Sequence, residues 1–97
     1  MSVAIVNRIR ARDKATFDSI IERFMNRSRL VDGMKGFQGI ELLVDREGLE
    51  VLVVTKWDSM ESLKAWLDSQ EFKAAHKREG PRLDAESEGR IYEVIPL

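Results

Sequence analysis

The single histidine of this chain, His76, has the most distinctive chemistry in the sequence. It lies in the segment FKAAHKREG, residues 72 to 80, four positions after Phe72 on the apolar side of an expected helix. An imidazole there can pack as a satisfied core residue, cap its helix or bind a metal. With no cysteine and no second histidine, the chain has too few strong ligands for a protein-only zinc site. A haem iron needs only one axial imidazole, although the pattern alone favours packing.

Two further residues depart from their local pattern. Asn7 shares a row with Val3, Ile5 and Ile9 in a strand-like segment, although asparagine is depleted in strands. The pattern alone favours an amide bonded to neighbouring backbone at a bulge or strand end. The alternative is an amide that points into a cavity and donates to a ligand. Trp66 lies on a helix stripe, where tryptophan is usually part of the core.

The distance between Trp66 and His76 suggests how they could act together. In one straight helix, ten residues at about 100° each would place the two side chains roughly 80° apart. A break near residues 68 to 70 would let both face one space between the helices and the sheet. We expect that space to be an apolar pocket, the usual kind of ligand site. Its expected walls are Phe24, Val54, Trp66 and Phe72.

The elements that must position these residues follow from periodicity and capping. Alternation over residues 3 to 10 predicts a first strand. Asp13 is the expected N-cap of a helix whose apolar stripe runs from Phe17 through Met25 to Ser28. Residues 32 to 37 form a loop. Two strands follow, 37 to 45 and 49 to 57, joined by a hairpin connection with Gly48 available for a positive φ.

The second half of the chain is predicted to hold two helices and a strand. Asp58 and Glu61 form a capping-box pattern that opens one helix, and Asp68 and Glu71 repeat it for a short second helix. Residues 78 to 89 are polar and rich in turn residues, and a last strand is expected over 91 to 95.

This order, β-α-β-β-α-α-β, predicts an α+β fold of the ferredoxin-like split βαβ type, with a four-stranded antiparallel sheet in one domain over residues 1–97. Helices on one face leave the other uncovered. The strand over 49 to 57 is nonetheless apolar on both faces, with Val51, Val53 and Trp57 on one and Leu52 and Val54 on the other. We therefore predict a two-fold homodimer whose sheets pack face to face.

Charge and composition exclude several classes of partner. Sixteen basic and seventeen acidic residues give a formal charge of −1, and the charges are scattered along the chain. We therefore expect no nucleic acid and no membrane as partner. No segment approaches eighteen consecutive apolar residues, and residues 1 to 8 carry no apolar signal core. These features predict a soluble, cytoplasmic protein.

Six segments together resemble a known family. They are NRI at 7 to 9, IIERF at 20 to 24, GMKGF at 33 to 37, TKWDS at 55 to 59, AWLDS at 65 to 69 and FKAAHK at 72 to 77. In order and spacing these resemble the IsdG-type haem-degrading monooxygenases, within the wider antibiotic biosynthesis monooxygenase (ABM) superfamily of dimeric α+β barrels. The likeness runs from Val3 to Lys77, and the last strand fits by position only.

The resemblance implies a role for each of the three unusual residues. The family's proximal iron ligand falls on His76, its distal asparagine on Asn7 and its pocket tryptophan on Trp66. Haem would then be both substrate and cofactor, with Asn7 bonded to oxygen on the side of the iron opposite His76. Trp66 would press on the porphyrin and hold it out of plane. Ring opening would use dioxygen and electrons from an external reductase, and would release iron and a linear tetrapyrrole.

Cations are expected for the two haem propionates, and the candidates are Arg23, Arg27, Lys77 and Arg78. Two other functions are compatible with the same residues. One is a cofactor-independent monooxygenase of the ABM type acting on a polycyclic aromatic substrate. The other is a dimer that binds haem without turnover.

Overall fold

The computed structural model describes residues 1–75 and 85–97. Its elements are β1 (Val3–Ala11), α1 (Lys14–Met25), a 3₁₀ helix η1 (Leu30–Gly33), β2 (Phe37–Asp45), β3 (Glu50–Trp57), α2 (Met60–Leu67), α3 (Gln70–Ala75) and β4 (Ala85–Glu93). The four strands form one antiparallel sheet in the order β2-β3-β1-β4. The predicted α+β ferredoxin-like class is therefore confirmed. No helix in the described ranges is long and apolar enough to cross a membrane.

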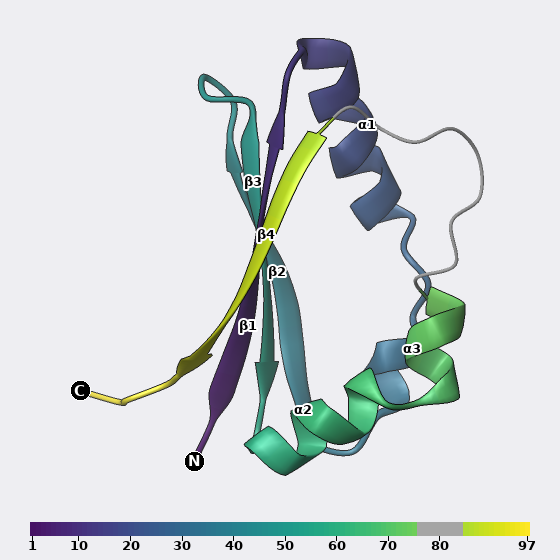
Figure 1. The fold of residues 1–97 in the computed structure, drawn as a ribbon, viewed down its shortest axis with the longest axis vertical. Helices are drawn as coiled ribbons and strands as arrows, with labels where there is room; N and C mark the ends of the chain where they lie inside the picture. Colours follow the sequence, from purple (N-terminus) through teal and green to yellow (C-terminus); the bar gives the residue numbers. More distant parts are fainter. Residues whose placement is uncertain (76–84) are drawn as a thin grey trace.

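The described helices lie on one side of the sheet, and none of them covers the other side, which we call the open face (Figure 1). Alternation along β3 directs Val51, Val53 and Trp57 toward the helices, where they are 1%, 3% and 0% exposed. Leu52 and Val54 face the open side and are only half-buried. The sequence pattern therefore assigned the two faces of this strand correctly.

Most of the buried side chains on the helix-covered face form two separate clusters. The first contains Val3, Val31, Trp57, Leu63 and Trp66 and lies under η1, α2 and α3. The second contains Ala11, Phe17, Ile20 and Val51 and lies under α1. A space therefore remains between them, over the middle of β1 and β3.

The last strand differs from its prediction, because β4 covers Ala85–Glu93 rather than residues 91 to 95. It pairs along its whole length with β1, from Ala85 opposite Ala11 to Glu93 opposite Val3. β4 is an edge strand, and every residue after Ala85 is exposed. Its residues are held by backbone bonds without an apolar alternation, so the sequence pattern did not reveal where it begins.

The hairpin between β2 and β3 also differs from its prediction. The positive φ of 55° falls on Leu49 and not on Gly48. Asp45 Oδ1 accepts from the backbone N–H of Glu47 and of Gly48, at 3.2 and 3.0 Å, which shapes the turn. Leu49 takes the left-handed conformation while its side chain packs against the cluster under α1.

Helix caps follow their predictions at α1 but are displaced by one residue at the later helices. Asp13 Oδ1 accepts from the N–H of Thr16 at 2.7 Å, as expected of an N-cap. The cap of α2 is Ser59 rather than Asp58. Ser69, not Asp68, accepts from the first turn of α3. The predicted stripe of α1 is too long, since the helix ends at Met25 and that side chain is 76% exposed.

Candidate functional site

The space between the two core clusters is a cavity of about 380 Å³, within the range of small-molecule sites. Its floor is the helix-covered face of the sheet, and Ile5, Asn7 and Val53 lie along it. Its walls include Phe24 of α1 on one side and the aromatic side chains of α2 and α3 on the other. The lining is mostly apolar, with a few polar groups.

Asn7 lies in the middle of this floor. It pairs regularly with Val53 of β3 and Gly89 of β4, and the irregular step in the sheet lies elsewhere, between Phe37 and Gly39. Within residues 1–75 and 85–97, no side-chain hydrogen bond to the Asn7 amide is found, and the residue lines the cavity. The structure thus favours the cavity-facing alternative over an amide satisfied at a bulge.

Trp66 is fixed within a series of aromatic contacts. Its ring stacks on Trp57 at a centroid distance of 6.3 Å and 26° between planes. Phe72 contacts Trp66 edge-to-face, with a centroid distance of 5.4 Å and 89° between planes. Phe37 contacts Trp57 at a centroid distance of 5.5 Å. Trp66 is 6% exposed, and Trp57, Trp66 and Phe72 all line the cavity. This wall is a rigid aromatic surface suited to a flat apolar ligand.

The predicted break between the two helices is present and is held by Ser69. The Ser69 hydroxyl donates to the carbonyl of Trp66 at 2.6 Å and accepts from the N–H of Phe72 at 3.0 Å. One hydroxyl therefore ends α2 and starts α3, which lets residues of both helices face the same cavity.

Of the candidate cations, Arg27 lies at the cavity and Arg23 does not line it. The Arg27 side chain is 20% exposed, pairs with Asp32 at 3.1 Å and donates to the carbonyl of Ser28 at 3.1 Å. Arg23 is exposed in the last turn of α1. The partly buried guanidinium of Arg27 is thus held at the cavity edge, where it can bind an anionic group.

The prediction that Val54 lines the pocket is wrong. It pairs with Val6 on the open side of the sheet, whereas Asn7 and its partner Val53 face the cavity. Successive residues of a strand point to opposite faces. Because Asn7 lies opposite Val53 and both face the cavity, Val54 must face the other way, and the prediction that Asn7 and Val54 line one pocket is wrong. His76, Lys77 and Arg78 lie outside the described residues.

Among the cavity residues that escaped the sequence prediction are three of β3: Val53, Thr55 and Trp57. The signal that could have identified them is the period of two along β3, which places Val53, Thr55 and Trp57 on the same face of the sheet as Asn7. Thr55 is 9% exposed and brings a hydroxyl group to the lining. Trp57 is fully buried, and its Nε1 has no hydrogen-bond partner among the described residues.

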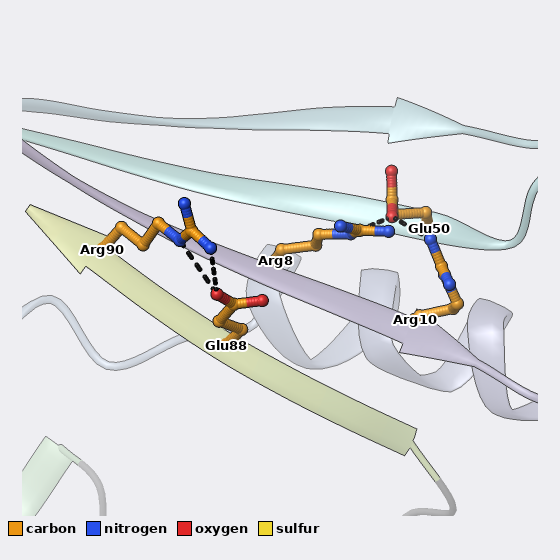
Figure 2. A network of polar contacts seen from close by, with 5 residues as sticks. All are labelled: Arg8, Arg10, Glu50, Glu88 and Arg90. Carbon is orange, nitrogen blue, oxygen red and sulfur yellow. Dashed lines mark hydrogen bonds and ion pairs between the residues drawn. The ribbon is translucent and has the colours of Figure 1, made fainter. Parts of the chain in front are cut away.

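Five charged residues of the sheet lie on its open face: Arg8, Arg10, Glu50, Glu88 and Arg90 (Figure 2). Arg8 and Arg10 of β1 both pair with Glu50 of β3, and on β4 Arg90 pairs with Glu88 at 2.8 Å. The hydrogen bond from Arg90 to Glu88 raises the pKa of the Arg90 guanidinium. These ion pairs therefore form a polar network on the open face and take no part in the cavity.

The fold and the cavity define a ferredoxin-like α+β protein with a cavity between its sheet and its helices. Comparison with known families is more specific. The family model described as antibiotic biosynthesis monooxygenase matches residues 2–78, and the chain belongs to this family.

Several relatives carry the name heme-degrading monooxygenase, and two of them illustrate the similarity. The protein from Halalkalibacterium halodurans is 39% identical over 85 residues, which cover 84% of this chain and 72% of the relative. The protein from Bacillus thuringiensis is 36% identical over 70 residues, which cover 69% of this chain. That match spans 64% of the Bacillus protein, slightly less than two thirds of its length.

Solved structures confirm the fold. MhuD, a heme degrader from Mycobacterium tuberculosis, was solved with two hemes in its active site and superposes with a TM-score of 0.79 at 24% identity, covering 97% of this chain and 96% of MhuD. A MhuD variant with two manganese protoporphyrin IX molecules per active site gives 0.80 at 26% identity, covering 97% and 95%. SnoaB, a cofactor-independent oxygenase from Streptomyces nogalater, gives 0.68 at 19% identity, covering 99% and 95%.

Proposed function

We propose that this chain is a haem-degrading monooxygenase that opens the porphyrin of bound haem with dioxygen and electrons from an external reductase. The products are iron and a linear tetrapyrrole. The observation that carries the proposal is the cavity itself, which has an aromatic wall and, at the centre of its floor, the Asn7 amide, for which the described residues provide no side-chain hydrogen bond. The relatives named heme-degrading monooxygenase support the same chemistry.

The described residues fit a haem. The macrocycle is flat and apolar, and the series Trp57, Trp66 and Phe72 provides a rigid aromatic wall for it. A propionate requires a cation, and Arg27 provides one at the cavity edge. The haem iron, once bound, supplies the oxygen chemistry.

Each protein group has a separate task in this proposal. The Asn7 amide donates a hydrogen bond within the cavity without offering an acidic proton, so it directs oxygen chemistry without the charge of an acid. Trp66, held between Trp57 and Phe72, resists displacement and would press on a bound macrocycle. His76, which follows α3 in the sequence, is the proposed axial ligand to the iron.

We further propose that the open face of the sheet packs against a second copy of the chain. Leu52 and Val54 are apolar and half-buried, and no described helix covers them. Leu43 and Tyr92 on the same face are each 48% exposed. Apolar side chains on an uncovered face gain most when a partner removes them from water, and an identical face provides the matching surface.

Titration of the purified protein with haemin, followed by ascorbate, tests the proposed function. We expect saturable binding, bleaching of the Soret band after reductant and release of iron to a chelator. His76→Ala should fail to form the same axial complex. Asn7→Ala should bind haem but degrade it roughly 10²-fold more slowly, as for loss of a donor in an active site. Asn26→Ala is the matched control, because that amide bonds to Glu22 on α1, away from the cavity.

The outcomes separate the three functions. Binding without bleaching would identify a haem carrier. If the wild type binds no haem, the function proposed here is wrong, and an oxygenase acting on an aromatic substrate in the same cavity becomes the better explanation. Arg27→Ala, compared with Arg23→Ala, checks the propionate contact. Only the first should weaken haem binding, by about tenfold for a lost charged hydrogen bond.

A further inference from the structure

Gly89 of β4 lies directly opposite Asn7 in the sheet, on the same helix-covered face. A Cβ atom at Gly89 would lie 2.5 Å from Asn7 Oδ1 and 3.7 Å from Asn7 Cγ. Apart from its chain neighbours, no other described residue would come within 4 Å of that atom. The amide of Asn7 therefore occupies the space that a side chain at position 89 would need.

The backbone does not explain the glycine. The positive φ angles of glycine occur at Gly36 and Gly39, and Gly89 is not among them. A glycine inside a strand weakens the strand and is typical of places where another group approaches closely. Here the approaching group is the Asn7 carbonyl oxygen, so position 89 is constrained by space rather than by conformation.

We propose that Gly89 is a positioning residue for Asn7, which rests on the function proposed above. By lacking a side chain, Gly89 lets the amide lie toward β4 and keeps the volume above Val53 open for the ligand. A methyl group at position 89 displaces the amide away from β4, toward β3. The amide then enters the ligand volume and its donor no longer lies where the reaction needs it.

Gly89→Ala tests this, with Gly33→Ala as the matched control. A Cβ at Gly33 meets nothing within 4 Å, so the control carries the same change of residue type without a clash. The first measurement is made on the protein without haem. This measurement is a ¹H–¹⁵N NMR spectrum. The chain has two asparagines and two glutamines, so the spectrum holds few side-chain amide signals. The pair of signals from the Asn7 side-chain amide is assigned by its loss in Asn7→Ala. We expect this pair to shift in Gly89→Ala and to stay unchanged in Gly33→Ala.

The second measurement is haem turnover in two backgrounds. Gly89→Ala should lower kcat roughly 10- to 100-fold, as expected for a misplacement of up to about 1 Å, with a smaller change in KM. In the Asn7→Ala background the same substitution should add nothing, because it acts only through the amide. Equal losses in both backgrounds, or an unshifted Asn7 signal, would overturn the proposal.

Failure to fold is also informative. If Gly89→Ala is unfolded, Asn7→Ala/Gly89→Ala should fold, since the clash is then removed. A double variant that also fails to fold would show that Gly89 is needed for another reason. Failure of the proposed function would appear in the wild type, which would neither bind nor bleach haem. Failure of the Gly89 proposal would leave an active wild type and a Gly89→Ala variant like it.

Discussion

Ser69 provides the strongest structural prediction, because one hydroxyl connects the two helices that carry the aromatic wall. Ser69→Ala removes its bond to the Trp66 carbonyl and its bond from the Phe72 N–H. Loss of a serine N-cap costs about 1 kcal/mol, and the second bond adds about 0.5–1 kcal/mol. We expect the free energy of unfolding to fall by about 1–2 kcal/mol. For a chain of this size, each kcal/mol lowers Tm by roughly 4–8 °C.

The same substitution should weaken haem binding, since α3 carries Phe72 to the cavity only when its first turn is formed. If re-forming the first turn of α3 on binding costs about 1 kcal/mol, the Kd for haem rises about fivefold. Urea unfolding of the haem-free protein and a haemin titration measure the two effects separately.

Ser59→Ala is the matched control for Ser69→Ala. Ser59 is also a half-buried serine N-cap, and its hydroxyl accepts from the N–H of Ser62 at 3.2 Å, but it lies at the start of α2 and not at the junction with α3 that Ser69 holds. It should lose a similar amount of stability with unchanged haem affinity. If both variants lose haem affinity equally, general destabilisation explains the effect. If Ser69→Ala is as stable as the wild type, the reasoning on its two bonds is wrong.

Three further predictions concern the open face, the first helix and the cavity floor. Val54→Asp should convert a dimer into a folded monomer, seen by light scattering; a monomeric wild type would contradict the dimer. The backbone hydrogen bond from Thr16 lowers the pKa of Asp13 below 3.8, so its stabilisation is present above that pH and is lost as pH falls through the folded pKa. Asp13→Asn should therefore be less sensitive to acid in urea unfolding below pH 3.8, and an unchanged pH profile would be the contrary result. Asn7→Leu should stabilise the haem-free protein by about 1–2 kcal/mol and abolish turnover; lower stability would show that the amide is already satisfied.

The interior strands could be predicted from sequence because burial imposes a strict period of two on them. The helix-facing positions of β3, from Val51 to Trp57, were assigned correctly for that reason. The start of β4 at Ala85 was missed because an exposed edge strand carries no such period. Caps were missed by one residue at Ser59 and Ser69 because an aspartate precedes each serine, and both residue types cap well.

The candidate site could be predicted only in part. Asn7 and Trp66 stood out as residues that the local pattern does not explain, and both line the cavity. Val54 was misplaced because it was selected for apolar character without applying the alternation that fixed Asn7. The clearance at Gly89 depends on the register between β1 and β4, and no pattern within one segment contains that register.

The cavity also explains why the chain retains two unfavourable residues in one row of the sheet. An asparagine that finds no hydrogen-bond partner among the described residues and a strand glycine both reduce stability, yet Asn7 and Gly89 face each other between the two core clusters. Apolar side chains at these positions would join the clusters into one core, a clear gain for a chain of 97 residues that buries little surface. The same change would fill the ligand volume and remove its donor. On the function proposed above, the split core is a loss of stability that provides a binding site, and a bound ligand would restore part of that stability by completing the packing.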